Sequence, residues 1–295
     1  MVALKHHVKR YLMNWFGGLP YYWAIYFKRH FRFPDTRNPA RLSEKILRRM
    51  MQPDPSFSLL SDKVGVREYV ARAVGRSYLI PVLGVFDRVD ADVLKNMPER
   101  FVIKPNHGAG FVKIIDNAAV IDMGEVAKEV NSWLSIDYGK LYGEKHYSCI
   151  APRVIIEESL VSDGVPPKDY KFNVFNSESG ECFCFIQVYS DRGSILKRAI
   201  MLEDWTPAPF KMVGYPDNSD EMINERPDGL AEMLEVAKAL AKPFGYCRVD
   251  LYYVSGKVYF SEMTFTPSAS KYKFIPRCWD AELGKRFAWP ENISI

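Results

Sequence analysis

The hydrophobic pattern of the chain alternates between short strand-like runs and longer stretches with helical spacing. Apolar residues recur every three to four positions over 62–74, 124–134 and 229–241, which predicts three helices, the first capped by Ser61 and ended by Gly75. Runs rich in β-branched and aromatic residues predict strands over 78–86, 101–115, 153–160, 169–175, 182–188, 247–254 and 257–265. Short turns join most neighbouring strands. The pattern therefore predicts an α+β fold with a mainly antiparallel sheet.

The first fifty residues differ from the rest of the chain in charge. They read as helices broken at residues 17–20 and at Pro34, and they hold eleven Lys and Arg residues against two acidic ones, a net charge of +9. The other 245 residues sum to −5. Ten aromatic residues interleave with these bases, a mixture that suits an anionic bilayer face, a lipid-linked glycan or an acidic partner. Alternatively, the aromatic side chains pack on the body of the protein and the bases are solvated. Nothing in this segment resembles a nucleic-acid reader motif.

Composition favours a globular protein of the reduced cytoplasm. The chain has 295 residues, room for one large core or two lobes, and no run of 18 or more apolar residues that could cross a membrane. Five scattered cysteines argue against a disulfide framework. Cys182 and Cys184 are expected to share a buried strand face. His6 and His7 lack metal-ligand partners at useful spacing, so no zinc site is predicted.

One lysine stands where an apolar strand is expected. In FVIKPNHGAGFVKII, residues 101–115, Lys104 lies inside the first apolar run and is followed by the glycine-containing segment NHGAG. A hairpin with an exposed lysine and a permissive turn would explain this arrangement. A clamp for nucleotide phosphates would explain it as well, because glycines let backbone N–H groups approach phosphate oxygens closely.

A second hairpin near the end of the chain gathers charged side chains. Arg248 and Asp250 are two residues apart on one strand, and Glu262 and Thr264 are two apart on the next. Each pair therefore shares a face of the sheet. Two facing carboxylates are a seat for Mg²⁺ when nucleotide phosphates supply further oxygens. A surface ion pair between Arg248 and one of the acids is the alternative.

These segments, taken in order, resemble the ATP-grasp superfamily, and most closely its TupA-like group, found in bacterial surface-polysaccharide gene clusters. The similar segments are SDKVGVREYVARAVGRSYLIPVLGVFD, FVIKPNHGAG, RVIIEESL, DYKFNVFNSE and CRVDLYYVSGKVYFSEMTFTP, with LSEKILRRM and WDAELG near the two ends. The resemblance spans roughly residues 40–285. It implies an ATP-grasp fold, in which two α+β lobes with mainly antiparallel sheets clamp ATP. A basic helical segment over 1–55 would then precede a catalytic domain over 56–295, with a small lobe inserted at about 100–160.

The resemblance also implies a nucleotide site. Lys63 would reach the α-phosphate, although a first-turn helix lysine is an equal reading, and Lys104 would be the second phosphate lysine. The loop from Asn106 to Gly110 would fold over the β- and γ-phosphates, with His107 as an added donor or simply a turn histidine. Glu157 and Glu158 would end a strand that leads to the hinge between the lobes. Because neighbours on a strand face opposite sides, one of the two would contact adenine or ribose, and the backbone of residues 159–160 would bond to the adenine edge. The implied set is Lys63, Lys104, Asn106, His107, Gly108, Ala109, Gly110, Glu157, Glu158 and Leu160.

For metal and chemistry, the resemblance assigns Mg²⁺ to Asp250, Glu262 and Thr264. Thr264 departs from the asparagine that many ATP-grasp enzymes have there, and the following PSAS segment departs from a glycine-richer pattern. Arg248 would stabilise the transferred phosphoryl group, and Lys171 would hold phosphate or the reacting carboxylate. Weaker candidates for an anionic substrate are Lys197 and Arg198.

The implied activity is an ATP-dependent carboxylate–amine ligase that forms an amide through an acylphosphate. Its substrates would be a uronic acid or other carboxylate of a bacterial surface polysaccharide, such as a capsule, and an amine. The protein would then work in the cytoplasm, with its basic N-terminal segment at the inner membrane face. A glycan kinase is the alternative activity. A glycosyltransferase is a further one, because Asp90-Ala-Asp92 has the letters of a DxD motif, although this segment reads as a helix start.

Overall fold

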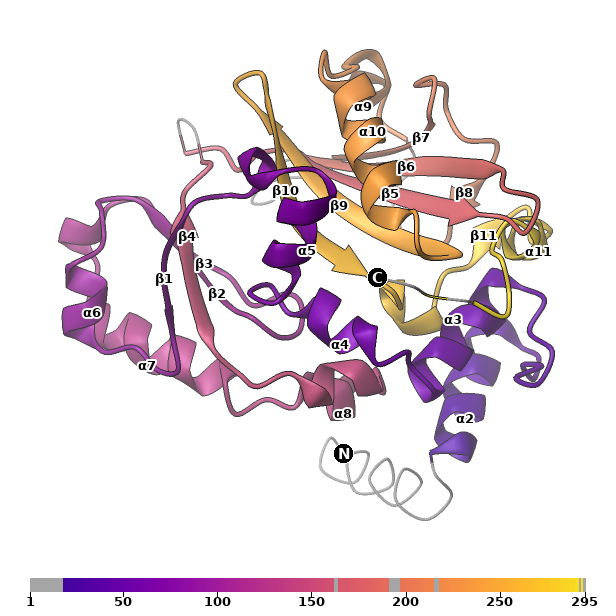
Figure 1. Ribbon diagram of the computed structural model, residues 1–295, viewed down its shortest axis with the longest axis horizontal. Coiled ribbons are helices and arrows are strands. Elements are labelled where there is room, and N and C mark those ends of the chain that lie inside the picture. Colours follow the sequence, from indigo (N-terminus) through magenta and orange to yellow (C-terminus); the bar gives the residue numbers. More distant parts are fainter. Residues whose placement is uncertain (1–17, 162–163, 191–196, 215–217, 292, 294–295) are drawn as a thin grey trace.

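Two antiparallel sheets form the framework of the protein (Figure 1). The computed structural model describes residues 18–161, 164–190, 197–214, 218–291 and 293. A four-stranded sheet has the order β1-β4-β2-β3, and a five-stranded sheet has the order β10-β9-β5-β6-β7. We call them the small sheet and the large sheet. The small sheet consists of β1 (Val82–Phe86), β2 (Phe101–Pro105), β3 (Lys113–Ile115) and β4 (Val154–Glu158). The large sheet consists of β5 (Asp169–Asn176), β6 (Cys182–Ser190), β7 (Lys197–Leu202), β9 (Tyr246–Val254) and β10 (Lys257–Thr264).

Helices cover one face of each sheet. The α-helices are α2 (Leu19–His30), α3 (Leu42–Met51), α4 (Ser56–Ser61), α5 (Val66–Ala73), α6 (Ala91–Lys95), α7 (Met123–Trp133), α8 (Tyr138–Tyr142), α9 (Asp220–Asn224), α10 (Leu230–Ala241) and α11 (Trp279–Lys285). Four 3₁₀ turns, η1 (Arg76–Tyr78), η2 (Ala118–Val120), η3 (Lys145–Cys149) and η4 (Pro267–Ser270), and the strand pair β8 (Lys211–Met212) and β11 (Phe274–Ile275) complete the described part. None of these helices is long and apolar enough to cross a membrane.

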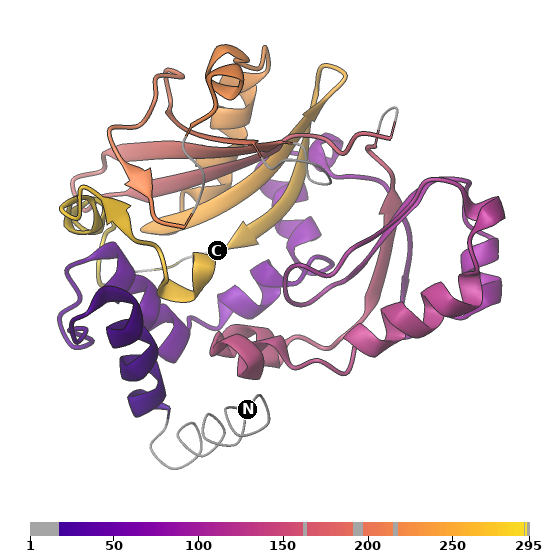
Figure 2. The ribbon, with the colours of Figure 1, turned by 180° about the vertical axis from the view of Figure 1, so that it is seen from behind.

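The small sheet buries the side of β2 that faces α7. Phe101 and Ile103 pack with Val126 and Val130 of α7, and α6 and α7 flank this sheet on its outer side (Figure 1). Residues alternate between faces along a strand, so Val102 and Lys104 lie on the opposite face. The loop between β2 and β3 extends from this sheet toward the end of β10 (Figure 2).

The large sheet has the same asymmetry. On one face, Val249 and Leu251 of β9 pack with the apolar side of α10, including Met233 and Ala237. The opposite face carries the alternate residues of β5 and β9, among them Lys171, Arg248 and Asp250. Part of this opposite face is covered as well, because Phe175, Phe185 and Ile200 pack there with α3. Only the rest of that face is left for polar side chains.

The predicted α+β class with antiparallel sheets is confirmed, as are the predicted hairpins and the helix break at Pro34. Of the break predicted at residues 17–20, the described part shows only that α2 begins at Leu19. Positions 1–17, including His6 and His7, lie outside the described residues. Asp90 starts α6, where its carboxylate accepts a hydrogen bond from the Val93 N–H at 2.8 Å. The reading of Asp90-Ala-Asp92 as a helix start is therefore confirmed.

The prediction of one helix over 62–74 is wrong. The chain forms α4 and α5 instead, with a turn between them, and Ser61 ends α4 rather than capping the next helix. The Asp62 carboxylate accepts a hydrogen bond from the Val64 N–H, and the Lys63 N–H donates to Asn106, so local and long-range contacts replace the helical ones.

The expectation for the two neighbouring cysteines is half right. Cys184 is buried in the core, but Cys182 is exposed. Cys182 pairs with Asn176 immediately beside the turn at 177–180, where β6 begins and has not yet entered the core.

A buried arginine ties α3 to the C-terminal part of the chain. The guanidinium of Arg49 donates to the backbone carbonyls of Phe265 at 3.0 Å and Tyr246 at 2.8 Å, and it pairs with Glu291. It also lies 4.5 Å from the centre of the Phe287 ring. Arg49 therefore connects α3 to β9 and to the end of β10. We call the hairpin of these two strands, which holds Asp250 and Glu262, the acidic hairpin.

Replacing Arg49 by Ala should destabilise the fold by about 3–5 kcal/mol, because it leaves the Glu291 carboxylate and two carbonyl groups without their partner. Urea unfolding followed by circular dichroism measures the change. Arg48→Ala is the matched control, because this half-buried neighbour makes no side-chain hydrogen bond or ion pair in the described structure. Arg48→Ala should lower the free energy of unfolding by only about 0.5 kcal/mol. Equal losses for both variants would contradict this role for Arg49.

Candidate active site

The strands β9 and β10 bring the predicted acidic hairpin together as one cluster. Asp250 lies opposite Glu262, and Arg248 lies opposite Thr264. The Arg248 guanidinium donates to Asp250 at 2.7 and 2.8 Å, to Glu262 at 2.8 Å and to Thr264 at 3.0 Å. The predicted sharing of faces is therefore confirmed.

A bulge in β10 makes this arrangement possible. Phe260 pairs with Leu251, but the next pair is Glu262 with Asp250, so Ser261 is one extra residue on β10. Without the bulge, Glu262 would pair with Val249 and point into the core beneath α10. With it, Phe260 and Met263 stay in the core, and Glu262 joins Asp250 on the polar face.

Lys171 on β5 adds a second cation to the cluster. It lies opposite Asp250, donates to that carboxylate, and forms an ion pair with Asp169 at 2.8 Å. Burial alone would lower the pKa of Lys171, but Asp250 and Asp169 raise it above its ordinary value. Lys171 is therefore charged, and it faces the cleft as the sequence predicts.

The small sheet contributes a separate ion pair on its polar face. Lys104 lies 3.0 Å from the Glu157 carboxylate, which also approaches Arg67 at 3.4 Å. Burial acts to lower the pKa of Lys104, but Glu157 raises it overall. The adjacent Glu158 is exposed at the end of β4, yet it lines the same cavity as Glu157, so the expectation that only one of the two faces the site is not confirmed.

Lys63 connects the glycine loop to the acidic hairpin. Its ammonium donates to the Gly108 carbonyl at 2.7 Å and lies 3.9 Å from Glu262. Burial lowers the pKa of Lys63. Burial would raise the pKa of Glu262, but Lys63 and Arg248 lower it to about 2, so this carboxylate stays ionised.

The glycine loop has an anchored half and a half that faces the cleft. Asn106 is fully buried, and its side chain bonds to Asp62, to the Ala151 carbonyl and to the Arg153 N–H. His107 is buried too and contacts the Ile136 carbonyl at 3.1 Å. Ala109 and Gly110 line a cavity between the two sheets, which is described below. Gly108 has φ +77°, and the Tyr138 ring leaves no room for a Cβ at this position. The side chains of Asn106 and His107 thus organise the loop.

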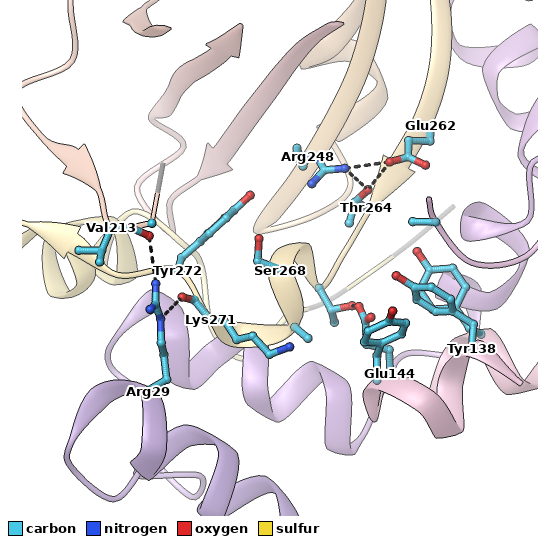
Figure 3. Close-up of a pocket in the computed structure, with 16 residues that line it drawn as sticks. Arg29, Tyr138, Glu144, Val213, Arg248, Glu262, Thr264, Ser268, Lys271 and Tyr272 are labelled. Carbon is cyan, nitrogen blue, oxygen red and sulfur yellow. Dashed lines mark hydrogen bonds and ion pairs between the residues drawn. The ribbon is translucent and has the colours of Figure 1, made fainter. Parts of the chain in front are cut away.

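Two cavities meet at the acidic hairpin. The first, about 510 Å³, lies between the sheets and is called the strand cavity. Its polar wall includes Lys63, Lys104, Glu157, Glu158, Lys171, Arg248, Asp250 and Glu262, and its apolar wall includes Val102, Ile114, Leu160 and Val161. The second, about 590 Å³, is called the tyrosine cavity (Figure 3). The two cavities share Ala109, Arg248 and Glu262.

The tyrosine cavity is lined by aromatic rings and is unevenly charged. Its rings are Tyr138, Tyr142, Tyr147 and Tyr272. Arg29 of α2 lies on its far side from Glu262 and donates to the carbonyls of Lys271 at 2.8 Å and Val213 at 3.1 Å (Figure 3). Neither Arg29 nor Lys271 forms an ion pair with any described carboxylate. Two cations without an acidic partner favour an anionic ligand.

Glu144 is the carboxylate of the tyrosine cavity outside the acidic hairpin. It accepts a hydrogen bond from the Thr266 hydroxyl, and burial raises its pKa to about 7. Next to it, Ser268, Ala269 and Ser270 have φ values of 54°, 47° and 62°, an unfavourable conformation for residues other than glycine. Ser270 is held there by its hydrogen bond to the Ser43 carbonyl at 2.6 Å.

The structure does not bring Lys197 and Arg198 to either cavity. Lys197 pairs with Glu221 at 2.7 Å, and Arg198 is buried with its guanidinium 5.7 Å from the Tyr189 ring. Both belong to β7, which is separated from β5 by β6. The tyrosine cavity itself was not predicted, because α2, α8, η3 and the segment after β10 each contribute only one or a few residues without any periodic signal.

The donor set suits Mg²⁺ that arrives with other oxygen ligands. Within the described ranges, no three His, Cys, Asp or Glu side chains cluster closely enough to hold a metal. Asp250 and Glu262 supply hard carboxylate oxygens, but Asp250 is already engaged by Arg248 and Lys171. The pair therefore fits a metal whose shell is completed by phosphate oxygens rather than a free ion.

Comparison with known proteins gives one family and several distant structures. A family model described as TupA-like ATPgrasp matches residues 40–288. The chain is similar to D-alanine–D-alanine ligase from Bacillus anthracis complexed with ATP, at 18% identity and a TM-score of 0.37, covering 71% of this chain and 54% of that one. It is similar to N5-carboxyaminoimidazole ribonucleotide synthetase from Thermus thermophilus, at 13% identity and a TM-score of 0.39, covering 76% of this chain and 51% of that one. It is also similar to D-alanine–D-alanine ligase from Helicobacter pylori, at 16% identity and a TM-score of 0.40, covering 79% of this chain and 60% of that one. The chain thus spans less than two thirds of these structures. No curated protein matches it.

Replacing Glu144 by Gln should change how stability depends on pH. The unfolded chain ionises this carboxyl near 4.5, whereas the folded protein keeps the proton up to about 7, so the folded state loses stability as the pH rises through this interval. The free energy of unfolding of the variant, relative to that of the native protein, should therefore rise by about 2–3 kcal/mol from pH 5 to pH 8.

Urea unfolding at the two pH values measures this difference. Glu99→Gln, at an exposed position, is the control and should follow the native protein at both pH values. A constant difference between the Glu144 variant and the native protein would show that Glu144 is ionised across the whole range.

Proposed function

The chain belongs to the TupA-like ATP-grasp family, and from this premise we propose that it is an ATP-dependent carboxylate–amine ligase. The observation that carries the proposal is the position of Arg248 and Glu262, which line both cavities. A phosphoryl donor in the strand cavity and an acceptor in the tyrosine cavity would meet at these two side chains.

The strand cavity suits ATP on both of its walls. Val102, Ile114 and Leu160 offer an apolar surface to the adenine ring. Lys63, Lys104 and the backbone of Ala109 and Gly110 offer positive charge and N–H donors to the phosphates. Asp250 and Glu262 would hold Mg²⁺, which neutralises phosphate charge during transfer.

The reaction would proceed in two steps. An oxygen of the acceptor carboxylate attacks the γ-phosphorus, the bond to the β–γ bridging oxygen breaks, and ADP leaves. The amine nitrogen then attacks the acyl carbon, inorganic phosphate leaves with its oxygen, and the nitrogen loses a proton. Arg248 and Lys171 would stabilise the charge that develops on the transferred group. Glu144 lies in the tyrosine cavity and has a pKa of about 7, so it would take the proton that the amine nitrogen loses.

The tyrosine cavity supports an acidic sugar as the acceptor. Tyrosine rings and hydroxyls suit the faces and hydroxyl groups of a sugar, and Arg29 and Lys271 suit a carboxylate. A uronic acid of a bacterial surface polysaccharide has this chemistry. We propose it as the substrate class, with an amino acid or other amine as the second substrate. The enzyme would work on the cytoplasmic side of the membrane.

A glycan kinase is the second candidate, because the same Lys104, Arg248 and Glu262 would transfer phosphate to a hydroxyl without any amine. The two activities differ in product. A ligase releases inorganic phosphate only when the amine is present, whereas a kinase leaves phosphate on the sugar. A glycosyltransferase lacks support, because Asp90 is used as a helix cap.

Lys104→Ala and Glu262→Gln should each lower ADP release by at least about 100-fold, because each removes a charge that faces the nucleotide phosphates or their metal. The assay combines ATP and Mg²⁺ with paired sets of uronic acids and amino acids and measures ADP. Lys95→Ala is the control, since this exposed lysine of α6 pairs only with Asp92. Near-native turnover of either site variant would contradict the assignment.

Arg29→Ala should raise the KM for a uronic acid about tenfold or more and leave the KM for ATP unchanged, because Arg29 lines only the tyrosine cavity. Steady-state kinetics with glucuronic acid as the probe measure both constants. Lys28→Ala, the neighbouring exposed lysine, is the control. A parallel rise in both KM values would indicate a general loss of structure instead.

A further inference from the structure

Helix α2 has one buried face and one exposed aromatic face. Tyr22 and Tyr26 point into the core, and the Tyr22 hydroxyl donates to the Gly143 carbonyl at 2.7 Å. Leu19, Trp23 and Phe27, spaced four residues apart, lie along the other face and are 37%, 38% and 43% exposed. The reading in which aromatic residues pack on the body therefore holds for one face of α2, and the other face is exposed.

The exposed face continues beyond the helix as one surface. Phe31 is 71% exposed and Phe33 is 66% exposed. The Phe33 ring lies 4.9 Å from Phe27 and 6.0 Å from Trp23. We call this surface, made of Leu19, Trp23, Phe27, Phe31 and Phe33, the α2 patch. Scattered apolar residues are normal on a protein surface, but three connected aromatic rings, with the exposed Phe31 directly after the helix, are typical of a docking site.

Basic residues lie on and beside the helix of the α2 patch. The described sequence from Leu19 to Pro34 contains three Lys and Arg residues and no Asp or Glu. Lys28 forms no ion pair with any described residue, and the Lys273 ammonium lies 5.4 Å from the centre of the Phe31 ring. The surroundings of the exposed rings are therefore cationic.

The carboxylates nearest to the patch do not cancel this charge. Glu44 and Asp280 are already paired with Arg32, at 2.5 and 2.9 Å. The exposed Asp35 accepts hydrogen bonds from the backbone of its own loop, from the N–H groups of Arg37 and Asn38. Asp35 keeps its negative charge, but Lys28, Arg29 and Lys273 outnumber it, so the described surroundings of the patch carry a net positive charge.

We propose that the α2 patch docks on an anionic lipid bilayer. Aromatic side chains favour the headgroup level of a membrane, and basic side chains beside them are attracted to anionic lipids. A second copy of this chain would fit less well, because a two-fold interface would bring the same cationic regions together. The inference concerns binding and does not depend on the proposed reaction.

Docking through α2 would also place the tyrosine cavity beside the membrane. Arg29, on the same helix as Trp23 and Phe27, is part of the cavity wall. An acceptor attached to a lipid would then reach the cavity without leaving the bilayer surface.

The test is flotation of the full chain with phosphatidylcholine vesicles, with and without phosphatidylglycerol, at low and high salt. The protein should float with the anionic vesicles at low salt, and binding should weaken when salt rises or phosphatidylglycerol is omitted. The triple variant Trp23→Ser, Phe27→Ser, Phe31→Ser should partition at least about tenfold less.

The matched control is Leu59→Ser, Val120→Ser, Val165→Ser, which removes three exposed apolar side chains elsewhere, and it should bind like the native protein. Unfolding temperatures of both triple variants verify that they are folded. The proposal is overturned if the native chain does not bind anionic vesicles at low salt, or if the patch variant binds as well as the control. It is also overturned if sedimentation shows a dimer that only the patch variant loses, because the patch would then serve a second copy.

Discussion

One extra residue in β10 brings the two carboxylates of the acidic hairpin to the same face of the large sheet. Side chains alternate strictly between the faces of a sheet, and α10 occupies one face of the large sheet. The bulge at Ser261 shifts the alternation by one position, so Phe260 and Met263 both remain in the core while Glu262 crosses to the polar face. Only this register lets Arg248 bond to both carboxylates at once. The two cavities share their boundary at this point because the hairpin is built in this way.

Two buried carboxylates side by side would repel each other and would each resist ionisation. Three cations from three different elements oppose this: Lys63 from the turn before α5, Lys171 from β5 and Arg248 from β9. They lower the pKa of Glu262, whereas burial still raises the pKa of Asp250 to about 6. The network keeps Glu262 charged without a bound ligand, and the same cations are the groups that a phosphate would contact. The contact between Lys63 and the Gly108 carbonyl extends this network to the glycine loop of the other sheet.

Much of this arrangement could be predicted from local patterns. Alternation placed Arg248 with Asp250 and Glu262 with Thr264, and the odd position of Lys104 is explained by a strand face that a cavity covers instead of a helix. The spacing of Val258, Phe260, Met263 and Phe265 contains the signal of the bulge, although only the pairing with β9 identifies it. The tyrosine cavity could not be predicted, because Arg29, Glu144 and Tyr272 come from segments far apart in the chain. Lys197 and Arg198 failed for a related reason: their charge is evident in the sequence, but the order of strands places β7 away from the cavities.

Helix α2 precedes residue 40, where the match to the family model begins. It nevertheless contributes Arg29 to the wall of the tyrosine cavity and carries the aromatic patch on its outer face. It is held to the body by the buried Tyr22 and Tyr26 and by hydrogen bonds of Arg29 and His30 with backbone carbonyls of the segment after β10. In the proposed roles, substitutions in this one helix could change both the acceptor and the membrane surface that the protein binds, while the strands that hold the acidic hairpin stay unchanged.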